Sequence, residues 1–196
     1  MSAAHGLTIN GTPRQVVLVE GESDKTAIET LAGRLGRHLE REGIAVVAMG
    51  GATNIRRYLQ LYGPEGAGLA LAGLCDRAEE DFFQRGLEEA RLGTKLDRAS
   101  MEALGFFVCV EDLEDELIRA LGVAHLEDVI ASAGEIRSLR SLQNQPAQRE
   151  RPLEAQLRRF FGSQSGRKSR YAKLIVEVLE PSRIPPPLAG LLTHLG

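Results

Sequence analysis

Carboxylates stand at the ends of several apolar segments of this chain. Glu20 directly follows the run 16–19, Asp76 follows the run 68–75, and a cluster of acids follows a third run, at 111–116. Acids that are held close together repel one another and raise one another's pKa. A hard cation such as Mg²⁺ or Mn²⁺, bound by carboxylate oxygens, removes that conflict. If the fold brings these acids together, the sequence therefore predicts a divalent-cation site.

The elements that must position these acids alternate between strand and helix. Apolar runs predict strands at about 15–20, 44–49, 68–75 and 105–110, and amphipathic patterns predict helices between them, the first at about 24–40. Such alternation is typical of a parallel, doubly wound sheet with right-handed crossovers. The carboxyl ends of parallel strands lie at one edge of the sheet, where open α/β sheets bind their ligands. We therefore expect the strand-end acids to converge at that edge.

Beyond residue 122 the pattern changes to helices without strands. Helices are expected at about 125–133, 153–161, 169–180 and 188–195, with a proline-stiffened bend at 181–187. We divide the chain into an α/β core over 14–122, with the acidic site, and a basic helical extension over 123–196. Residues 137–173 hold ten Lys and Arg against two Glu, although the whole chain has a net charge of -3. This local excess of positive charge favours binding to phosphates.

Several other kinds of chemistry are not supported by the residue pattern. The four histidines do not have the spacing of a zinc site, and neither a G-x-S-x-G elbow nor a G-x-x-x-x-G-K-[ST] phosphate loop occurs. Cys75 and Cys109 lie in apolar runs and are predicted to be buried, reduced thiols. No apolar run has membrane-spanning length and no signal peptide is recognisable, so we expect a cytoplasmic protein that does not contact membranes.

The order of these motifs resembles a Toprim domain, the fold shared by topoisomerases and primases. The resemblance is carried by Glu20-Gly21 after the first strand, Gly50-Gly51 after the second and Leu74-Cys75-Asp76 after the third. It is closest to the Toprim half, the C-terminal half, of the OLD-family (overcoming lysogenization defect) endonucleases. In that family a second acid follows the leading Glu-Gly by four residues, which Asp24 matches.

Two later segments extend the resemblance, so that it covers about 14–180. Residues 105–114 resemble the fourth strand of the OLD family with its acidic exit, and residues 166–172 resemble its late lysine motif. The resemblance implies a Toprim-type, Rossmann-like sheet of about four parallel strands flanked by helices, followed by a C-terminal helical extension.

The resemblance also implies a metal-dependent DNA nuclease that hydrolyses phosphodiester bonds by a two-metal mechanism, in DNA repair or phage defence. It makes Glu20 and Lys168 catalytic, with Lys168 neutralising charge that develops on the phosphate. The expected ligands of two Mg²⁺ or Mn²⁺ ions are Glu20, Asp24, Asp76, Glu80, Asp112, Glu114 and Glu116. The residues expected to contact DNA are Arg158, Arg159, Arg167, Lys168 and Arg170. Ala78 stands where Toprim domains usually have a second Asp, and Glu79 or Glu80 is expected to replace it.

Two other functions stay open at this point. A non-hydrolytic Toprim module that binds DNA or a partner, similar to recombination mediators, is favoured by Ala78, whereas Glu20, Asp24 and Lys168 favour the nuclease. A flavodoxin-like nucleotide-binding domain is less well supported, because its phosphate loop would carry hydroxyl groups or glycine in place of acids. The OLD family fuses its Toprim domain to an ATPase, which these residues do not contain. DNA is the expected partner, and whether the chain acts alone or with a separately encoded ATPase stays open. Self-association stays open.

Overall fold

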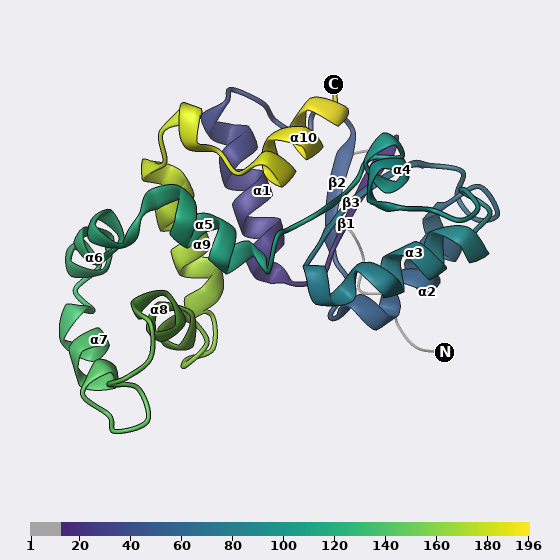
Figure 1. Ribbon diagram of the computed structural model, residues 1–196. Helices are drawn as coiled ribbons and strands as arrows, with labels where there is room; N and C mark the ends of the chain where they lie inside the picture. Colours follow the sequence, from purple (N-terminus) through teal and green to yellow (C-terminus); the bar gives the residue numbers. More distant parts are fainter. Residues whose placement is uncertain (1–12) are drawn as a thin grey trace, which may run out of the picture.

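A parallel four-stranded sheet lies at the centre of the computed structural model, which describes residues 13–196 (Figure 1). Its strands are β1 (Gln15–Val19), β2 (Ile44–Ala48), β3 (Ala70–Cys75) and β4 (Phe106–Val108), in the order β2-β1-β3-β4. The chain runs from β1 to β2 on one side and returns to the other side of β1 to form β3. The predicted parallel α/β sheet is thus confirmed, and the reversal between β1 and β3 is a topological switch point, where such sheets bind ligands.

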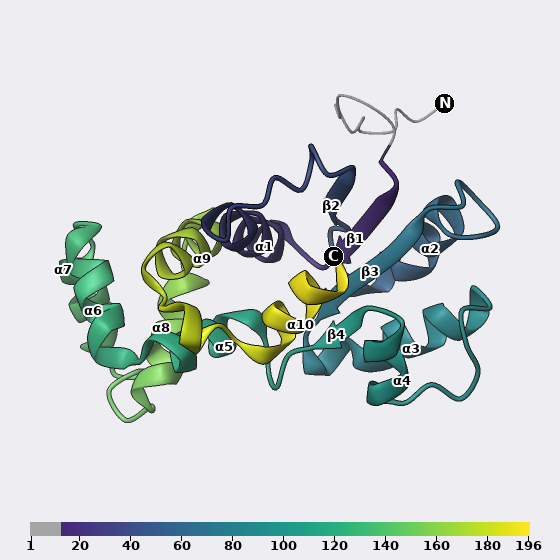
Figure 2. The same ribbon diagram turned by 90° about the horizontal axis from the view of Figure 1, so that it is seen from above.

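β1 is buried on both faces, as its unbroken apolar sequence predicts. Val17 and Val19 contribute to one apolar cluster, whereas Val16 and Leu18 contribute to another on the opposite face. The first face is covered by α1 (Glu22–Arg34), α9 (Arg167–Val178) and α10 (Pro186–His194). The second is covered by α2 (Ile55–Tyr62), α3 (Glu80–Glu89) and α4 (Arg98–Ala103) (Figure 2). Because helices cover both faces and strands flank both sides of β1, the ends of β1 are its accessible part.

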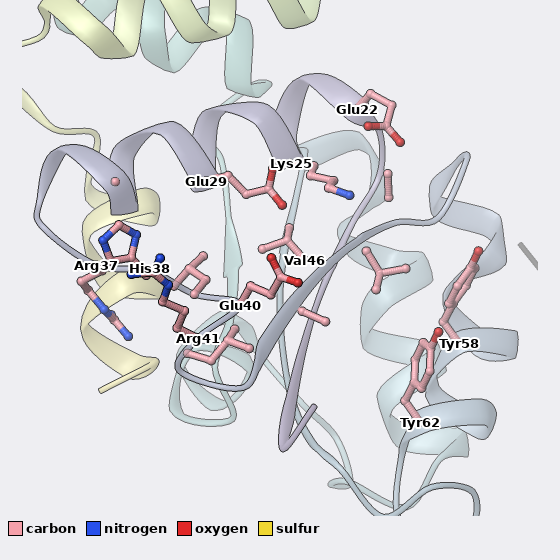
Figure 3. A pocket seen from close by; sticks show the side chains of 16 residues that line it. Glu22, Lys25, Glu29, Arg37, His38, Glu40, Arg41, Val46, Tyr58 and Tyr62 are labelled. Carbon is pink, nitrogen blue, oxygen red and sulfur yellow. The ribbon is translucent and has the colours of Figure 1, made fainter. Parts of the chain in front are cut away.

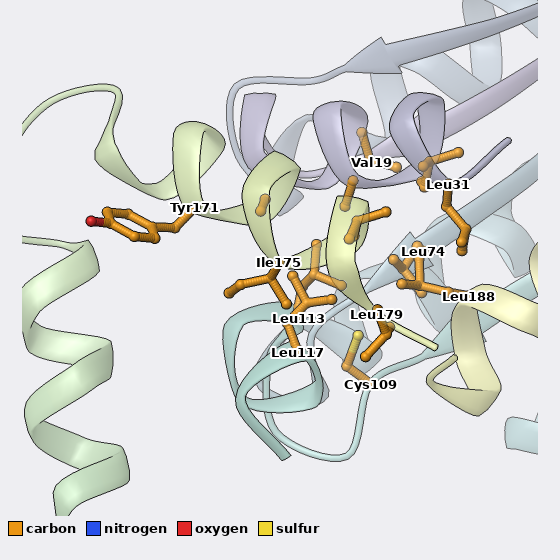
Figure 4. Packing of buried hydrophobic residues seen from close by; sticks show 14 of the residues in the cluster. Val19, Leu31, Leu74, Cys109, Leu113, Leu117, Tyr171, Ile175, Leu179 and Leu188 are labelled. Carbon is orange, nitrogen blue, oxygen red and sulfur yellow. The ribbon is translucent and has the colours of Figure 1, made fainter. Parts of the chain in front are cut away.

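A helical lobe projects from the sheet and consists of α6 (Val123–Ser132), α7 (Ile136–Gln143) and α8 (Leu153–Phe161). It is attached through α5 (Leu113–Leu121) and α9. One apolar cluster runs without interruption from Leu74 on β3 through Leu117 on α5 to Tyr171 on α9 and into the lobe (Figure 4). α9 then packs along α1, and α10 packs against β3 and β4. The apolar core therefore crosses the predicted domain boundary between residues 122 and 123.

The first helix ends earlier than the sequence pattern predicts. It was expected to reach about residue 40, but α1 ends at Arg34. Gly36 follows with a φ of +77°, a left-handed conformation that ends helices and that glycine adopts without strain. The chain then turns back toward β2, and the guanidinium of Arg37 donates a hydrogen bond of 2.7 Å to the carbonyl oxygen of Leu192 on α10.

Two helices and one strand boundary also differ from the predictions. The fourth strand, expected over 105–110, is hydrogen-bonded as a strand only over Phe106–Val108. α4 was not predicted, although Asp97 caps it by accepting the backbone N–H of Ser100 at 2.8 Å. α7 was not predicted either, although Leu139 and Leu142 are spaced to face the core and are buried. Both helices are short, so their periodic signal covers too few residues to stand out.

Both cysteines are buried and free, as predicted. Cys75 belongs to the cluster on the α2 and α3 face, and Cys109 belongs to the cluster on the α1 and α9 face (Figure 4). Across residues 13–196, no helix combines the length and apolar character needed to cross a membrane.

Candidate metal centre

The carboxyl ends of β1 and β3 lie next to each other, because the two strands pair in parallel along their length. Glu20 follows β1 and Asp76 follows β3, so both acids leave the sheet at the same edge. The loop after β2 reaches over this edge: the N–H groups of Gly50 and Gly51 donate to the carbonyl oxygen of Glu20 at 3.0 and 3.1 Å. Both glycines have positive φ angles, 72° and 123°, which explains the Gly-Gly pair in the sequence. These two bonds fix the backbone from which the Glu20 carboxylate projects.

Asp24 turns back toward this edge from the first turn of α1. Its Oδ2 accepts the backbone N–H of Gly21 at 2.8 Å. Burial raises the pKa of Asp24 to about 7, and the like charges of Glu114 and Glu20 add to the effect against the opposing Gly21 hydrogen bond. The four-residue spacing between Glu20 and Asp24 thus brings the two acids within electrostatic reach of each other.

Asp76 lies among the other acids. Its Oδ1 accepts the backbone N–H of Leu113 at 3.2 Å, which ties it to the start of α5. Burial raises the pKa of Asp76 to about 8, and four neighbouring carboxylates raise it further: Asp24, Asp112, Glu20 and Glu114. We call these five acids the carboxylate edge. They belong to three strand ends, which confirms the geometric premise that the strand-end acids converge.

The position of the missing second Asp lies on a single 3-10 turn, Arg77–Glu79, where Ala78 is exposed. Burial raises the pKa of Glu20, and the next largest cause is the charge of Glu79 on this turn. Glu80 begins α3 instead and forms an ion pair with Arg98 on α4. The structure therefore brings Glu79 toward the carboxylate edge and engages Glu80 elsewhere. The sequence shows both acids but not which one faces inward.

Glu116 is not turned toward the other acids. It is buried, with 4% of its surface exposed, and its Oε1 accepts the backbone N–H of Val110 at 2.8 Å. The same oxygen lies 3.0 Å from the guanidinium of Arg119. These partners give Glu116 a structural role, in which it holds the connection between β4 and α5.

Two cations from the C-terminal helices reach the carboxylate edge. Arg158 on α8 pairs with Oδ2 of Asp112, whose Oδ1 accepts the backbone N–H of Asp115 at 2.8 Å. Lys168 in the first turn of α9 lies 3.2 Å from Oε1 of Glu114. Partial burial disfavours the charged form of Lys168, but the neighbouring carboxylates outweigh it and raise its pKa. Lys168 is therefore held as a cation beside the acids.

The other basic residues expected to contact DNA differ in their exposure and in their partners. Arg159 is exposed on α8. Arg167 is buried, with 5% of its surface exposed, and its guanidinium stacks over the ring of Phe160 at 4.2 Å. Arg170 is half exposed and lies 3.3 Å from Glu135, which also pairs with Arg167 at 3.4 Å. Arg167 and Arg170 thus tie α9 to the start of α7, and Arg167 is not placed to reach DNA in this structure.

The carboxylate edge has the donor atoms of a hard-cation site without a preassembled ligand set. Within residues 13–196, no three His, Cys, Asp or Glu side chains are grouped closely enough to hold one ion together. Glu20, Asp24 and Asp76 nevertheless supply oxygen donors, and a divalent cation relieves the repulsion that raises their pKa values. The residues present therefore fit Mg²⁺ or Mn²⁺ in donor type and in charge.

A cavity of about 770 Å³ opens on another part of the sheet, along the free side of β2 (Figure 3). Its lining includes Lys25 and Glu29 from α1 and Tyr58 and Tyr62 from α2. The charges in it are mixed, and the predicted metal ligands do not line it. We assign the candidate site to the carboxylate edge, because two acids there have pKa values shifted toward neutrality by burial and by like charges.

Comparisons with known proteins show which sequences and folds this chain is similar to. Residues 13–77 match the family model of the overcoming lysogenization defect protein-like TOPRIM domain. The C-terminal region of the Xanthomonas campestris pv. campestris OLD protein is 27% identical, with a TM-score of 0.72 over 93% of this chain and 94% of that chain. The C-terminal region of the Burkholderia pseudomallei OLD protein is 25% identical, with a TM-score of 0.71 over 93% and 97% of the two chains. No protein with a curated function matches the sequence.

Proposed function

We propose that this chain, which contains an OLD-like Toprim domain, hydrolyses phosphodiester bonds in DNA with divalent cations bound at the carboxylate edge. The family model and the solved neighbours indicate a metal-dependent enzyme of nucleic acids. The observation that carries the nuclease proposal is the convergence of Glu20, Asp24 and Asp76 at the switch point between β1 and β3, with the cationic Lys168 beside them.

Three acids of the carboxylate edge, together with Glu79, are the metal ligands in this proposal. Glu20, Asp24 and Asp76 are the expected ligands of one Mg²⁺ or Mn²⁺ ion, and Glu79 replaces the missing second Asp in binding another. Glu80 and Glu116 are left out, because their carboxylates are engaged with Arg98 and with Val110 and Arg119 respectively. When bound, the cations lower the pKa of a water molecule and stabilise the leaving oxygen of the phosphodiester.

Glu20 and Lys168 are the residues of the chain that we expect to act on the reacting groups. Within residues 13–196 the Glu20 carboxylate makes no hydrogen bond or ion pair, and burial raises its pKa, so it is available to accept a proton from the attacking water. Lys168 is half exposed and charged, so its ammonium group can lie against the phosphate and stabilise the charge of the transition state.

Plasmid cleavage tests the proposal directly. The purified chain, incubated with supercoiled plasmid and Mg²⁺ or Mn²⁺, should produce nicked or linear DNA, and EDTA should prevent it. Glu20→Gln and Asp76→Asn should abolish cleavage while circular dichroism stays native, because both changes remove a charge at nearly constant volume. Asp128→Asn, on the exposed face of α6, is the matched control and should cleave normally. Normal cleavage by both carboxylate variants would move the chemistry to another site.

A second function is favoured by Ala78, which removes one expected ligand. In that case the chain binds DNA or a partner protein in a cation-dependent manner without hydrolysing DNA. The sequence resembles the OLD family, which joins its Toprim domain to an ATPase, so an ATPase is the partner that we propose for either function. Cation-dependent retention of a short duplex, with no product after prolonged incubation, would favour this second function.

A further inference from the structure

Asp112 has both carboxylate oxygens engaged. Oδ1 accepts the backbone N–H of Asp115 at 2.8 Å and caps α5, and Oδ2 pairs with the guanidinium of Arg158. The helix cap depends on Oδ1 alone. A divalent cation that binds Asp112 without breaking the helix cap therefore competes with Arg158 for Oδ2.

Asp112 is linked to the centre of the carboxylate edge through the backbone. The residue that follows it, Leu113, donates its N–H to Oδ1 of Asp76 at 3.2 Å. Arg158 comes from α8, 46 residues away in sequence, so the helical lobe places a positive charge directly on this edge. Lys168 from α9 does the same at Glu114, at 3.2 Å.

The pair between Arg158 and Asp112 is placed to open. The Arg158 side chain is 42% exposed, whereas that of Asp112 is 18% exposed, so the guanidinium already borders solvent. An ion pair with this exposure favours its closed over its open form by only about 1.4- to 5-fold. The attraction of a doubly charged ion to the same carboxylates can exceed this preference. A guanidinium that leaves a carboxylate can bind a phosphate in the same way, because its two parallel N–H groups can donate hydrogen bonds to two oxygens of either anion.

We propose that Arg158 is an exchangeable counter-ion: a divalent cation at the carboxylate edge displaces its guanidinium from Asp112, and the released guanidinium binds a phosphate of the DNA. The exchange rests on the function proposed above, and it couples cation binding to DNA binding through one side chain. No covalent bond forms or breaks in it.

Calorimetry with Mn²⁺ tests the first half of the exchange. Arg158→Gln removes the competing cation and should tighten the Kd for Mn²⁺ about two- to fivefold, in keeping with the weak pair. Arg159→Gln, on the same turn of α8, removes an equal charge that has no ion-pair partner within residues 13–196, and should change the Kd less than about 1.5-fold. In an Asp112→Asn background, where Asn keeps the helix cap, Arg158→Gln should no longer tighten binding.

DNA binding across a salt series tests the second half. With Ca²⁺ present, Arg158→Gln should reduce the slope of log Kd against log salt by about 0.9, the value for one phosphate contact, whereas in EDTA the slope should not change. Arg158→Lys keeps the charge and should retain most of the slope, and circular dichroism checks that every variant is folded.

The outcomes separate the exchange from the proposed function. If the wild-type chain does not bind Mn²⁺, both are overturned. If it binds Mn²⁺ but Arg158→Gln and Arg159→Gln behave alike, or Asp112→Asn leaves the Kd unchanged, only the exchange is overturned. If Arg158→Gln reduces the salt slope equally in Ca²⁺ and in EDTA, Arg158 is a permanent DNA contact. If Arg158→Gln changes neither slope, the released guanidinium does not bind DNA. Either result overturns the exchange.

Discussion

Removing the charge of Asp76 should stabilise the protein when divalent cations are chelated. Asp76→Asn is nearly isosteric, and the amide oxygen can still accept the N–H of Leu113, which the carboxylate accepts at 3.2 Å. What the substitution removes is a negative charge held among Asp24, Asp112 and the other acids of the carboxylate edge. The ligand charge needed for the proposed function is thus expected to weaken the fold.

The size of this effect follows from the pKa of Asp76, which burial and like charges raise from 3.8 to about 8. The folded state binds this proton more tightly than the unfolded state, so the free energy of unfolding falls as pH rises from about 4 to about 8. At about 1.36 kcal/mol per pKa unit, the upper limit of the loss in free energy of unfolding is about 6 kcal/mol. Asp76 is only partly buried, and water and side chains adjust around it, so we expect about 2 kcal/mol at pH 8, or about 4–8 °C in Tm.

Urea denaturation in EDTA at pH 8 and at pH 4 measures this effect. Asp76→Asn should exceed the wild type in free energy of unfolding at pH 8, and the difference should shrink as pH falls to 4, where Asp76 is protonated in the folded state and partly protonated in the unfolded state. Asp128→Asn, exposed on α6, should show no such pH-dependent gain. Millimolar Mn²⁺ should then stabilise the wild type by mass action, and Asp76→Asn less. Equal free energies of unfolding for the wild type and Asp76→Asn at pH 8, or a difference that does not change with pH, would refute the inference that the neighbouring carboxylates destabilise the charged form of Asp76.

Three further substitutions address single residues of the site. Glu79→Gln should lower the rate of plasmid cleavage about tenfold. Glu80→Gln, which breaks only the exposed pair with Arg98, should leave the rate unchanged and lower the free energy of unfolding by under about 1 kcal/mol. The wild-type rate in both variants would show that neither acid is a ligand. Lys168→Ala should lower single-turnover cleavage about 100-fold and DNA affinity under about threefold, since its charge acts in the transition state; equal losses of both would make it an ordinary phosphate contact. Gly51→Ala should destabilise the fold by about 1–2 kcal/mol, measured by urea denaturation, because a φ of 123° strains any residue with a Cβ; unchanged stability would show that the loop relaxes.

The parts of the fold that the sequence predicts are those encoded by local signals. The run 16–19 has no polar residue, which marks a strand buried on both faces, and β1 is indeed the central strand beside β3. Because parallel strands share one carboxyl edge, the convergence of Glu20 and Asp76 follows from the alternation of strands and helices alone. The end of α1 was mispredicted for a local reason too, since Gly36 ends the helix before its apolar pattern stops.

The direction of each charged side chain was not predictable, because it depends on contacts between distant segments. Glu79 and Glu80 are adjacent in sequence, and the pairing of Glu80 with Arg98 on α4 is a contact with a later segment. The same holds for Arg158 and Arg159, which differ because α8 brings Arg158 alone to Asp112. Hydrophobic periodicity carries no information on such choices, which arise only when α4, α8 and α9 have packed.

The basic excess of residues 137–173 acquires a different meaning in the folded chain. Much of it is paired within the protein: Arg140 with Glu127, Arg167 and Arg170 with Glu135, Arg158 with Asp112 and Lys168 with Glu114. The first three pairs lie between helices and stabilise the lobe, whereas the last two are directed at the carboxylate edge. Two of these C-terminal charges, Arg158 and Lys168, therefore balance acids that follow the strands. At the carboxylate edge this charge is available to DNA only where a pair can be exchanged, so the DNA affinity of this chain should depend on the cation as well as on salt.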